Sequence, residues 1–310
     1  MTRTVVAREY GGPEVLAIQD IELPAPADDQ VLVDVCAAGA NPVDYKLYSG
    51  GMGDDPAALP MPMGMEVAGV VAAAGSGARG YTGALAVGDE VIATNVRGGY
   101  AEQVLVAGSD VGHKPANVSF EQAAGLILVG GTAWHLLTKT DVGTGETVLI
   151  HGASGGVGLM AVQLTVARGA RVIGTASIAR HGQLREYGAH PVAYGPGLAD
   201  RVRAIAAVDA ALDLVGTDEA LDTSVELVAD RGRIATIAGF GRAGELGIAA
   251  LTGADGGQAI RDAARPELIK LAAEGRLEVT VDRVFALAEA AEAHRYLQTG
   301  HARGKVVLVP

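Results

Sequence analysis

Residues 147–158 constrain the fold of this chain more than any other segment. They read Thr-Val-Leu-Ile-His-Gly-Ala-Ser-Gly-Gly-Val-Gly, an apolar strand that runs directly into a glycine-rich turn. An Ala-, Leu- and Val-rich helical pattern follows the turn. This order is typical of the phosphate-binding turn of a dinucleotide site, because a position without a side chain lets a pyrophosphate approach main-chain N–H groups. The start of the helix adds partial positive charge for the phosphates.

The context of the turn strengthens this interpretation. Its pattern is A-x-G-G-x-G, so an alanine takes the place of the usual first glycine. The expected helix at residues 156–168 ends before a glycine, and a second strand at 171–175 completes a strand–helix–strand unit. We assign Gly155 to the approach of the phosphate and Gly158 to close packing of the helix on the strand. The predicted cofactor contacts of the turn are Ala153, Ser154, Gly155, Gly156, Val157 and Gly158.

The end of the second strand indicates which dinucleotide binds. In NAD sites this strand ends in Asp or Glu, which accepts hydrogen bonds from the ribose hydroxyls. Here the position is Ala176, and Ser177 and Arg180 follow it. A hydroxyl and a guanidinium suit a 2′-phosphate, so the sequence predicts NADPH rather than NADH. The alternative is that Ser177 only caps the next helix and that Arg180 is solvated.

Composition narrows the class of protein. A chain of 310 residues exceeds the usual size of one core, so we expect two lobes. A formal charge of −12 argues against nucleic acid or an anionic membrane as a partner. The single cysteine, Cys36, permits no internal disulfide, and residues 1–5 lack the apolar core of a signal peptide, so we expect a cytoplasmic protein. The apolar run at 123–129 is too short to span a bilayer.

The pattern of elements changes near residue 117. Before it, β-branched segments broken by Gly and Pro predict a mainly β lobe, with strands near 4–6, 31–36, 66–73, 90–94 and 100–106. After it, helices alternate with short apolar strands near 148–151, 172–175, 191–194, 211–215 and 232–238, which predicts a parallel sheet. The last part should form helices at 266–274 and 286–299 and a strand at 305–309. We expect this tail to return to the β lobe.

Five motifs together resemble one family. They are Asn-Pro-Val-Asp at 41–44, Gly-Met-Glu-Val-Ala-Gly at 64–69, Val-Gly-Asp-Glu-Val at 87–91, the turn at 152–158 and Gly-Lys-Val-Val-Leu at 304–308. In this order they resemble the zinc-independent medium-chain dehydrogenases/reductases of the quinone oxidoreductase, or zeta-crystallin, type. The resemblance implies an α/β protein with a GroES-like β lobe (1–117 and 280–310) and a Rossmann lobe with a doubly wound parallel sheet (118–279). It also implies NADPH in the cleft between the lobes.

The resemblance further implies the chemistry. Members of the family reduce quinones or the activated double bonds of enones and enals, and they are similar to the enoyl reductase modules of polyketide synthases. The expected substrate is therefore a small electrophilic molecule: a quinone, an enone, an enal or an enoyl thioester. We also expect a homodimer. The alternative from another class is a redox sensor or scaffold that binds NADPH without turnover.

No zinc site is expected. Cys36 stands alone, and the seven histidines show no ligand spacing. By similarity to the zinc-dependent alcohol dehydrogenases, Asn41 and Met65 occupy the places of a ligand Cys and a ligand His. Glu66 remains from that pattern, and we interpret it as a structural hydrogen-bond partner. Without a Lewis acid, reduction of an already electrophilic acceptor is favoured over oxidation of an unactivated alcohol.

Residues 41–46 supply the catalytic candidates Asn41, Tyr45 and Lys46. An acceptor that takes hydride at carbon needs mainly alignment and a hydrogen bond or a proton. By the resemblance, Lys46 stands where the zinc relatives carry a proton-relaying residue. The alternatives are that Lys46 is a solvated base, that Tyr45 is a packed ring, and that solvent donates the proton.

Further cofactor contacts are implied by the resemblance. Thr132 matches a residue near the nicotinamide, and Tyr194 matches one beside the 2′-phosphate. Two successive predicted strands end in the remaining candidates, at the carboxyl edge where such folds bind ligands. These residues are Val215, Gly216, Ala238, Gly239 and Phe240. For Tyr194 and Phe240 ordinary packing is the alternative.

Overall fold

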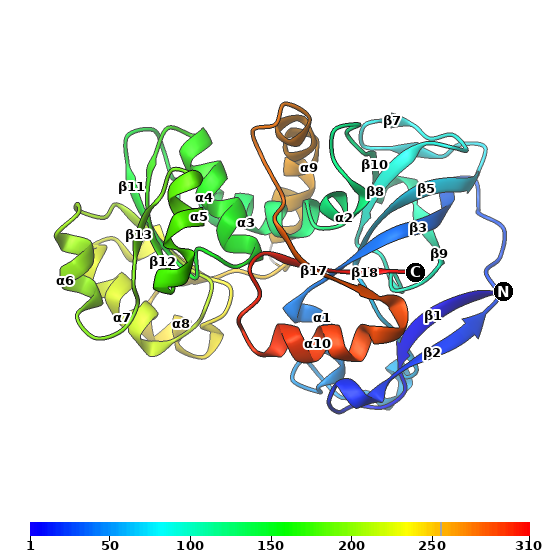
Figure 1. Ribbon diagram of the computed structural model, residues 1–310, viewed down its shortest axis with the longest axis horizontal. Coiled ribbons are helices and arrows are strands. Elements are labelled where there is room, and N and C mark those ends of the chain that lie inside the picture. Colours follow the sequence, from blue (N-terminus) through cyan, green and yellow to red (C-terminus); the bar gives the residue numbers. More distant parts are fainter. Residues whose placement is uncertain (255) are drawn as a thin grey trace. The chain divides into compact units, whose positions relative to one another are not determined.

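The computed structural model describes residues 1–254 and 256–310, which form two compact units (Figure 1). The first, here called the β unit, comprises Met1–Leu128, Pro266–Ala273 and Val279–Pro310. The second, the α/β unit, comprises Val129–Arg265 and Glu274–Glu278. Helices α3 (Ile127–Lys139) and α9 (Gly257–Ala273) each contain one of the boundaries.

A seven-stranded sheet organises the β unit. Its order is β10-β8-β5-β3-β18-β17, and β9 also pairs with β3. The bounds are β3 (Gln30–Ala40), β5 (Glu66–Ala74), β8 (Glu90–Thr94), β9 (Gln103–Ala107), β10 (Val111–His113), β17 (Val281–Ala286) and β18 (Lys305–Val309). Along β3, Val31, Val33 and Val35 are buried at alternate positions, as expected of a strand with one face on a core. β18 pairs antiparallel with β3, which confirms that the tail returns to the β lobe.

Smaller elements complete the β unit. β1 (Thr2–Ala7) pairs antiparallel with β2 (Leu16–Ile21) and with β4 (Met61–Pro62). β6 (Arg79–Gly80) and β7 (Gly83–Ala84) form a two-stranded sheet. The helices are α1 (Pro42–Tyr48), α2 (Phe120–Ala123) and α10 (Ala290–Gln298), and α10 lies beside α1 (Figure 1).

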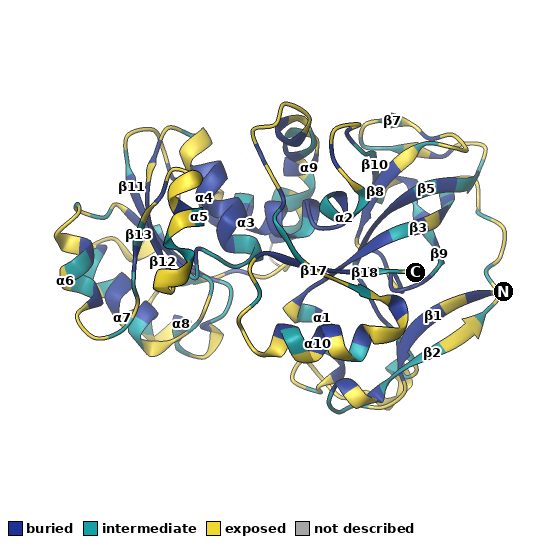
Figure 2. Cartoon of the chain, in the orientation of Figure 1, coloured by how far each residue is buried: buried dark blue, intermediate teal, exposed yellow. Residues whose placement is uncertain are grey.

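The α/β unit contains a six-stranded, wholly parallel sheet of order β13-β12-β11-β14-β15-β16. The strands are β11 (Thr147–His151), β12 (Arg171–Thr175), β13 (His190–Val192), β14 (Ala210–Asp213), β15 (Ile234–Thr236) and β16 (Ala249–Ala250). The intervening helices are α4 (Gly156–Ala167), α5 (His181–Glu186), α6 (Leu198–Arg203), α7 (Asp218–Leu227) and α8 (Phe240–Leu246). Every residue of β11 is buried (Figure 2), because helices pack on the faces of a parallel sheet. The sheet confirms the predicted Rossmann architecture.

Some predicted boundaries were wrong. α9 begins at Gly257, so Pro266 lies inside this helix and not at its start. Proline is most frequent in the first turn of a helix, but here the helix extends nine residues before it. The strand β17 was missed, and the helix expected from residue 286 begins as a 3₁₀ turn at Leu287 followed by α10. β17 is an edge strand with mostly exposed or half-buried residues, so it lacks an apolar alternation.

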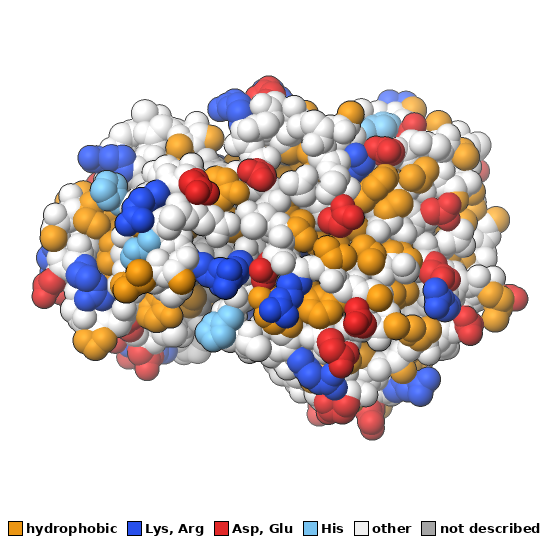
Figure 3. Space-filling model, in the orientation of Figure 1, with side chains coloured by type: hydrophobic (Ala, Val, Ile, Leu, Met, Phe, Trp, Pro, Cys, Tyr) orange, Lys and Arg blue, Asp and Glu red, His pale blue; other side chains and the backbone are white. Residues whose placement is uncertain are grey.

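The surface carries charges of both signs. Figure 3 shows Lys and Arg side chains interspersed with Asp and Glu over the visible face of the described residues. Within the described part of the chain, no helix combines the length and apolar character that crossing a membrane requires.

Candidate functional site

Two glycines of the glycine-rich turn, Gly155 and Gly158, differ in how much space a side chain would have. A Cβ on Gly158 would lie 2.2 Å from the carbonyl oxygen of Gly152, so the packing of α4 on the turn requires a glycine there. A Cβ on Gly155 would find its nearest atom at 3.5 Å, an ordinary contact. Gly155 is also the N-cap of α4 and makes no side-chain cap, so no side chain of the N-cap covers the helix start. The protein itself therefore does not need a glycine at 155, whereas a ligand approaching the main chain does.

Ala153, which replaces the usual first glycine, is accommodated by the neighbouring strand. Its side chain is fully buried, and its N–H donates to the carbonyl oxygen of Thr175, 3.1 Å away. A Cβ on Gly174 of β12 would lie only 2.8 Å from the Cβ of Ala153. The methyl group of Ala153 therefore occupies space that Gly174 leaves open.

The loop after β12 places the two predicted phosphate partners in one short turn. Ala176 is buried, and Ser177 is the exposed N-cap of a 3₁₀ turn, Ile178–Arg180. The Ser177 hydroxyl makes no capping hydrogen bond, which contradicts the alternative that it only caps the next helix. Arg180 closes the same turn and is half-buried.

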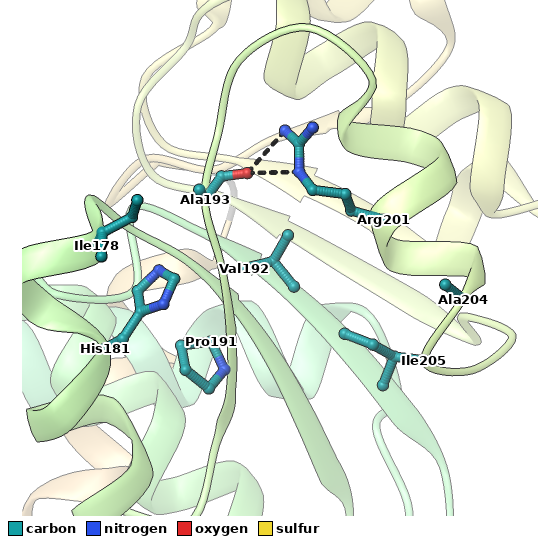
Figure 4. Close-up of a pocket in the computed structure, with 8 residues that line it drawn as sticks. All are labelled: Ile178, His181, Pro191, Val192, Ala193, Arg201, Ala204 and Ile205. Atoms are coloured by element: carbon teal, nitrogen blue, oxygen red, sulfur yellow. Dashed lines mark hydrogen bonds between the residues drawn. The ribbon is translucent and has the colours of Figure 1, made fainter.

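A surface pocket of about 490 Å³ lies against the edge strand β13 (Figure 4). Figure 4 shows Ile178 and His181 on one side and Arg201 of α6 on the other. The Arg201 guanidinium donates to the carbonyl oxygen of Ala193 from Nε (3.1 Å) and from Nη2 (2.8 Å). It also donates to the carbonyl oxygens of residues 195 and 196, both at 2.7 Å. These hydrogen bonds from Arg201 hold the loop that carries Tyr194.

Exposed apolar side chains follow four of the six strands at the carboxyl edge of the sheet, two on each side of β11. They are Ile178 after β12, Tyr194 after β13, Val215 after β14 and Phe240 after β15, with exposed fractions of 76%, 59%, 46% and 45%. Apolar side chains that gather on one exposed face of a protein often mark a site that a ligand or partner covers. This edge is where open parallel sheets bind their ligands. Thr132, the remaining predicted cofactor contact in this unit, is buried in α3.

The catalytic candidates lie together on α1 in the β unit. The side chain of Asn41 is buried, and its amide nitrogen donates to the Gly39 carbonyl (3.2 Å) and to Oε1 of Glu66 (3.0 Å). Its Oδ1 accepts from Nζ of Lys305 at 2.7 Å. Both amide N–H groups are therefore used within the protein. This leaves Asn41 none to donate to a substrate, so Tyr45 and Lys46 remain the stronger candidates.

A buried ion pair lies beside Asn41. Nζ of Lys305 lies 2.7 Å from Oε1 of Glu66, and both residues are buried. The second oxygen of Glu66 accepts from the Leu128 N–H at 3.2 Å, so Glu66 has the structural role that the sequence predicted. Among the described residues no group of three or more His, Cys, Asp or Glu side chains could hold a metal ion. An ammonium group with one carboxylate and one amide does not fit a zinc site.

A buried polar network beside α1 was not predicted. Oδ2 of Asp44 accepts from the Tyr100 hydroxyl (2.7 Å) and from the Asn41 N–H (2.8 Å). The Tyr100 and Tyr48 hydroxyls lie 3.1 and 2.8 Å from the two ring nitrogens of His294. Burial raises the pKa of Asp44 to about 6 and lowers the pKa of His294 to about 4. Asp44 belongs to a motif visible in the sequence, but His294 lies on an ordinary amphipathic helix and gives no local signal.

Tyr45 and Lys46 differ in their surroundings. Tyr45 is half-buried, with its ring edge-on to that of His294 at a centroid distance of 6.5 Å. Burial raises the pKa of Tyr45, so its hydroxyl keeps its proton at neutral pH. Lys46 is exposed in the β unit. The catalytic role of both residues stays a prediction.

Comparison with known proteins identifies the family. The description "Alcohol dehydrogenase GroES-like domain" matches residues 27–142, and "Zinc-binding dehydrogenase" matches residues 187–308. A quinone oxidoreductase of Pseudomonas aeruginosa is 35% identical over an alignment that covers 100% of both chains. The chain belongs to the quinone oxidoreductase family. It is therefore an oxidoreductase of the zinc-independent branch of the medium-chain dehydrogenases/reductases, which confirms the predicted family and fold class.

Solved structures of similar proteins cover the full chain. An Escherichia coli quinone oxidoreductase complexed with NADPH has a TM-score of 0.86 and 28% identity, covering 100% of each chain. An NAD-dependent alcohol dehydrogenase has a TM-score of 0.87 and 29% identity, covering 99% of each chain. The CurK enoyl reductase has a TM-score of 0.86 and 25% identity, covering 99% of each chain.

Proposed function

We propose that this quinone oxidoreductase family member reduces quinones and the activated double bonds of α,β-unsaturated carbonyl compounds with NADPH. The observation that carries the cofactor part is the carboxyl edge of the parallel sheet. There a helix start without a side-chain cap follows a glycine turn, and an exposed apolar side chain follows each of four strands, two on either side of the strand that leads into the turn. This combination suits a long ligand with a charged middle and flat apolar ends.

The residues fit NADPH in an ordered way. The main chain at Gly155, Gly156 and Val157 would bind the pyrophosphate, because α4 starts there without a side-chain cap. Ser177 and Arg180, which share one short turn, are the residues that we propose bind the 2′-phosphate, and Tyr194 would cover that end of the cofactor. Val215, Gly216, Ala238, Gly239 and Phe240 would line the remaining length, and Thr132 the nicotinamide.

The acceptor follows from the β unit. The Lys305–Glu66 pair and Asn41 do not form a ligand set for a zinc ion that would stabilise an alkoxide, so an already electrophilic acceptor is favoured. Bound NADPH supplies a hydride. The protein then needs to exclude water, align the acceptor and offer a proton to the oxygen or carbon that becomes negative. Tyr45, whose hydroxyl stays protonated at neutral pH, and Lys46 are the donors that we propose.

Two relatives support both halves of the substrate class. The Pseudomonas aeruginosa protein is a quinone oxidoreductase, and the CurK protein is an enoyl reductase. The alternative is a redox sensor or scaffold that binds NADPH without turnover. The homodimer and the cytoplasmic location stay predictions of the sequence.

One assay tests the proposal. The purified protein, treated with a chelator, is mixed with NADPH and a panel of quinones, enals, enones and enoyl thioesters, and the reduced-nicotinamide absorbance is followed. Turnover with at least one class supports the reductase. Tight NADPH binding without turnover on any acceptor would favour the sensor, and activity that returns only with added zinc would contradict the metal-free mechanism.

A further inference from the structure

The last row of the parallel sheet carries polar side chains that no cofactor motif includes. In the hydrogen-bonded register, Thr175, His151, Asp213 and Thr236 are direct neighbours on β12, β11, β14 and β15. Each is the final residue of its strand, and all four are buried. Buried polar groups at one edge of a sheet need partners, and here the partners lie mainly in the loops that leave the strands.

Asp213 organises the loop that follows its own strand. Its Oδ1 accepts the N–H of Val215 at 3.1 Å and the N–H of Gly216 at 3.0 Å. Its Oδ2 accepts the N–H of Gly216 at 3.1 Å and the hydroxyl of Thr236 at 2.6 Å. Every hydrogen bond to this side chain is one that a carboxylate accepts, so a side-chain amide at 213 would place donors against donors.

Thr236 continues the same arrangement into the next loop. Because its hydroxyl hydrogen goes to Asp213, its oxygen is free to accept, and it accepts the N–H of Ala238 at 3.0 Å and the N–H of Gly239 at 2.7 Å. One carboxylate and one hydroxyl therefore satisfy four backbone N–H groups in two loops. We call Asp213 and Thr236 the loop hub.

Close backbone contacts join these loops to each other and to the glycine turn. A Cβ on Gly216 would lie 2.7 Å from the carbonyl carbon of Ala238. A Cβ on Gly152 would lie 2.6 Å from a methyl carbon of Val215. The phosphate turn, the loop after β14 and the loop after β15 are thus packed closely against one another.

His151 adds no charge next to Asp213 at neutral pH. It neighbours Asp213 in the sheet, and burial lowers its pKa to about 4, although the Asp213 carboxylate opposes the shift. At neutral pH His151 is therefore uncharged, and it leaves the negative charge of Asp213 to the backbone N–H groups and the Thr236 hydroxyl.

We infer that Asp213 and Thr236 are positioning residues of the dinucleotide site. They hold the loops that carry Val215, Gly216, Ala238, Gly239 and Phe240 in the conformation that receives the cofactor. They act through backbone N–H groups and do not touch the ligand. This inference rests on the proposed NADPH function and adds two residues that are buried beneath the binding surface.

The decisive variants are Thr236→Val, which keeps the shape but removes the hydroxyl, and Thr236→Ser, which keeps the hydroxyl. We expect Thr236→Val to raise the Kd for NADPH at least tenfold and Thr236→Ser to stay within threefold of the wild type, both by direct titration. Asp213→Asn should raise the Kd similarly. The double variant, Asp213→Asn with Thr236→Val, should have a Kd close to that of the weaker-binding single variant, because both substitutions disrupt the same loop hub.

Hydrogen exchange of the cofactor-free protein gives a readout that does not depend on activity. The amides of residues 215, 216, 238 and 239 should exchange at least tenfold faster in Thr236→Val than in the wild type. Val202→Ala is the matched control. Val202 is fully buried on α6, outside the two loops, so its replacement by alanine leaves a cavity in the same unit. It should lower the melting temperature without changing the Kd or the exchange of those four amides.

The outcomes separate two failures. A wild-type protein that binds no NADPH overturns the proposed function and, with it, the cofactor role of the hub. Wild-type binding together with an unchanged Kd or unchanged loop exchange in Thr236→Val overturns the inference alone. So does a Val202→Ala variant that loses as much affinity as Thr236→Val, since the effect would then follow from general destabilisation.

Discussion

Gly155 and Gly158 stand three positions apart in one turn, yet they should respond differently to a methyl group. Gly158→Ala places a Cβ against backbone atoms, so we expect a loss of about 1–3 kcal/mol in the free energy of unfolding. Gly155→Ala meets no atom closer than 3.5 Å, so the protein should fold normally but bind NADPH at least about tenfold more weakly. Urea unfolding and NADPH titration measure the two effects.

Gly244→Ala is the control for this pair. Gly244 lies in α8 with open space around the position of a Cβ, and an alanine in a helix is favoured by about 0.5–1 kcal/mol. If Gly155→Ala binds NADPH as tightly as Gly244→Ala does, the turn is not the pyrophosphate site.

Arg180 should decide the choice between the two nicotinamide cofactors. Because Ala176 offers no carboxylate to the ribose, we expect NADPH to bind at least about tenfold more tightly than NADH, a difference of about 1.4 kcal/mol. Arg180→Ala should remove most of this preference and leave NADH binding nearly unchanged. Equal affinities in the wild type would contradict the assignment.

Tyr45 and Lys46 carry the prediction about proton transfer. Lys46→Ala and Tyr45→Phe should lower kcat/KM for enones more than for quinones, because a reduced quinone takes protons from water directly. General acid assistance is worth about 10²–10⁴-fold where it contributes to the rate. NADPH affinity is measured in parallel. Changes of only a few-fold in enone reduction, once cofactor binding is accounted for, would make both residues architectural.

Among the secondary-structure elements, β18 depends on a buried charge. Lys305 at its start pairs with Glu66 on β5 and also donates to Asn41 before α1. Lys305→Met leaves Glu66 buried without its partner, so we expect a loss of about 3–5 kcal/mol in the free energy of unfolding. Adding Glu66→Gln should recover a large part of that loss.

An exposed pair provides the comparison. Arg276 pairs with Glu274 at 3.2 Å with both side chains largely exposed, so Arg276→Met should cost less than about 1 kcal/mol. Equal losses for Lys305→Met and Arg276→Met in urea unfolding would show that burial of the first pair has no energetic consequence.

The pH dependence of stability involves both units. His151 and His294 have pKa values of about 4 in the folded protein, below the ordinary 6.5. Between these values the histidines are protonated in the unfolded chain but not in the folded protein, so stability falls as the pH drops from 6.5 to 4. Asp44 acts in the opposite direction. Its pKa of about 6 lies above the ordinary 3.8, so the stability that the protonated Asp44 contributes is lost as the pH rises from 3.8 to 6.

Two histidines outweigh one aspartate, so about one net proton is taken up on unfolding near pH 5. The free energy of unfolding should therefore fall by about 1.4 kcal/mol for each unit by which the pH drops in that range. His294→Gln should flatten the slope, whereas the same change at the exposed His301 should leave it unaltered. A slope of zero between pH 4.5 and 5.5 would contradict the shifts.

Local sequence determined the parts of this protein that depend on neighbouring residues. The strand at 147–151, the glycine turn and the helix after it were predictable, because backbone freedom at glycine and apolar runs act over a few residues. The same holds for the parallel sheet, since short apolar strands alternating with helices have few other arrangements. The β-branched segments before residue 117 likewise predicted the β lobe, and the family motifs then indicated its GroES-like type.

Only the tertiary structure decided which distant polar groups meet. Lys305 reaches Glu66 and Asn41 across more than two hundred residues of sequence, and His294 joins Tyr48 and Tyr100 across 246 and 194 residues. The hub formed by Asp213 and Thr236 depends on strand register, which places two strand ends side by side. Burial then makes each pairing obligatory, because an unpartnered polar group away from water is costly. A sequence records which groups can pair, but register and burial choose the partners.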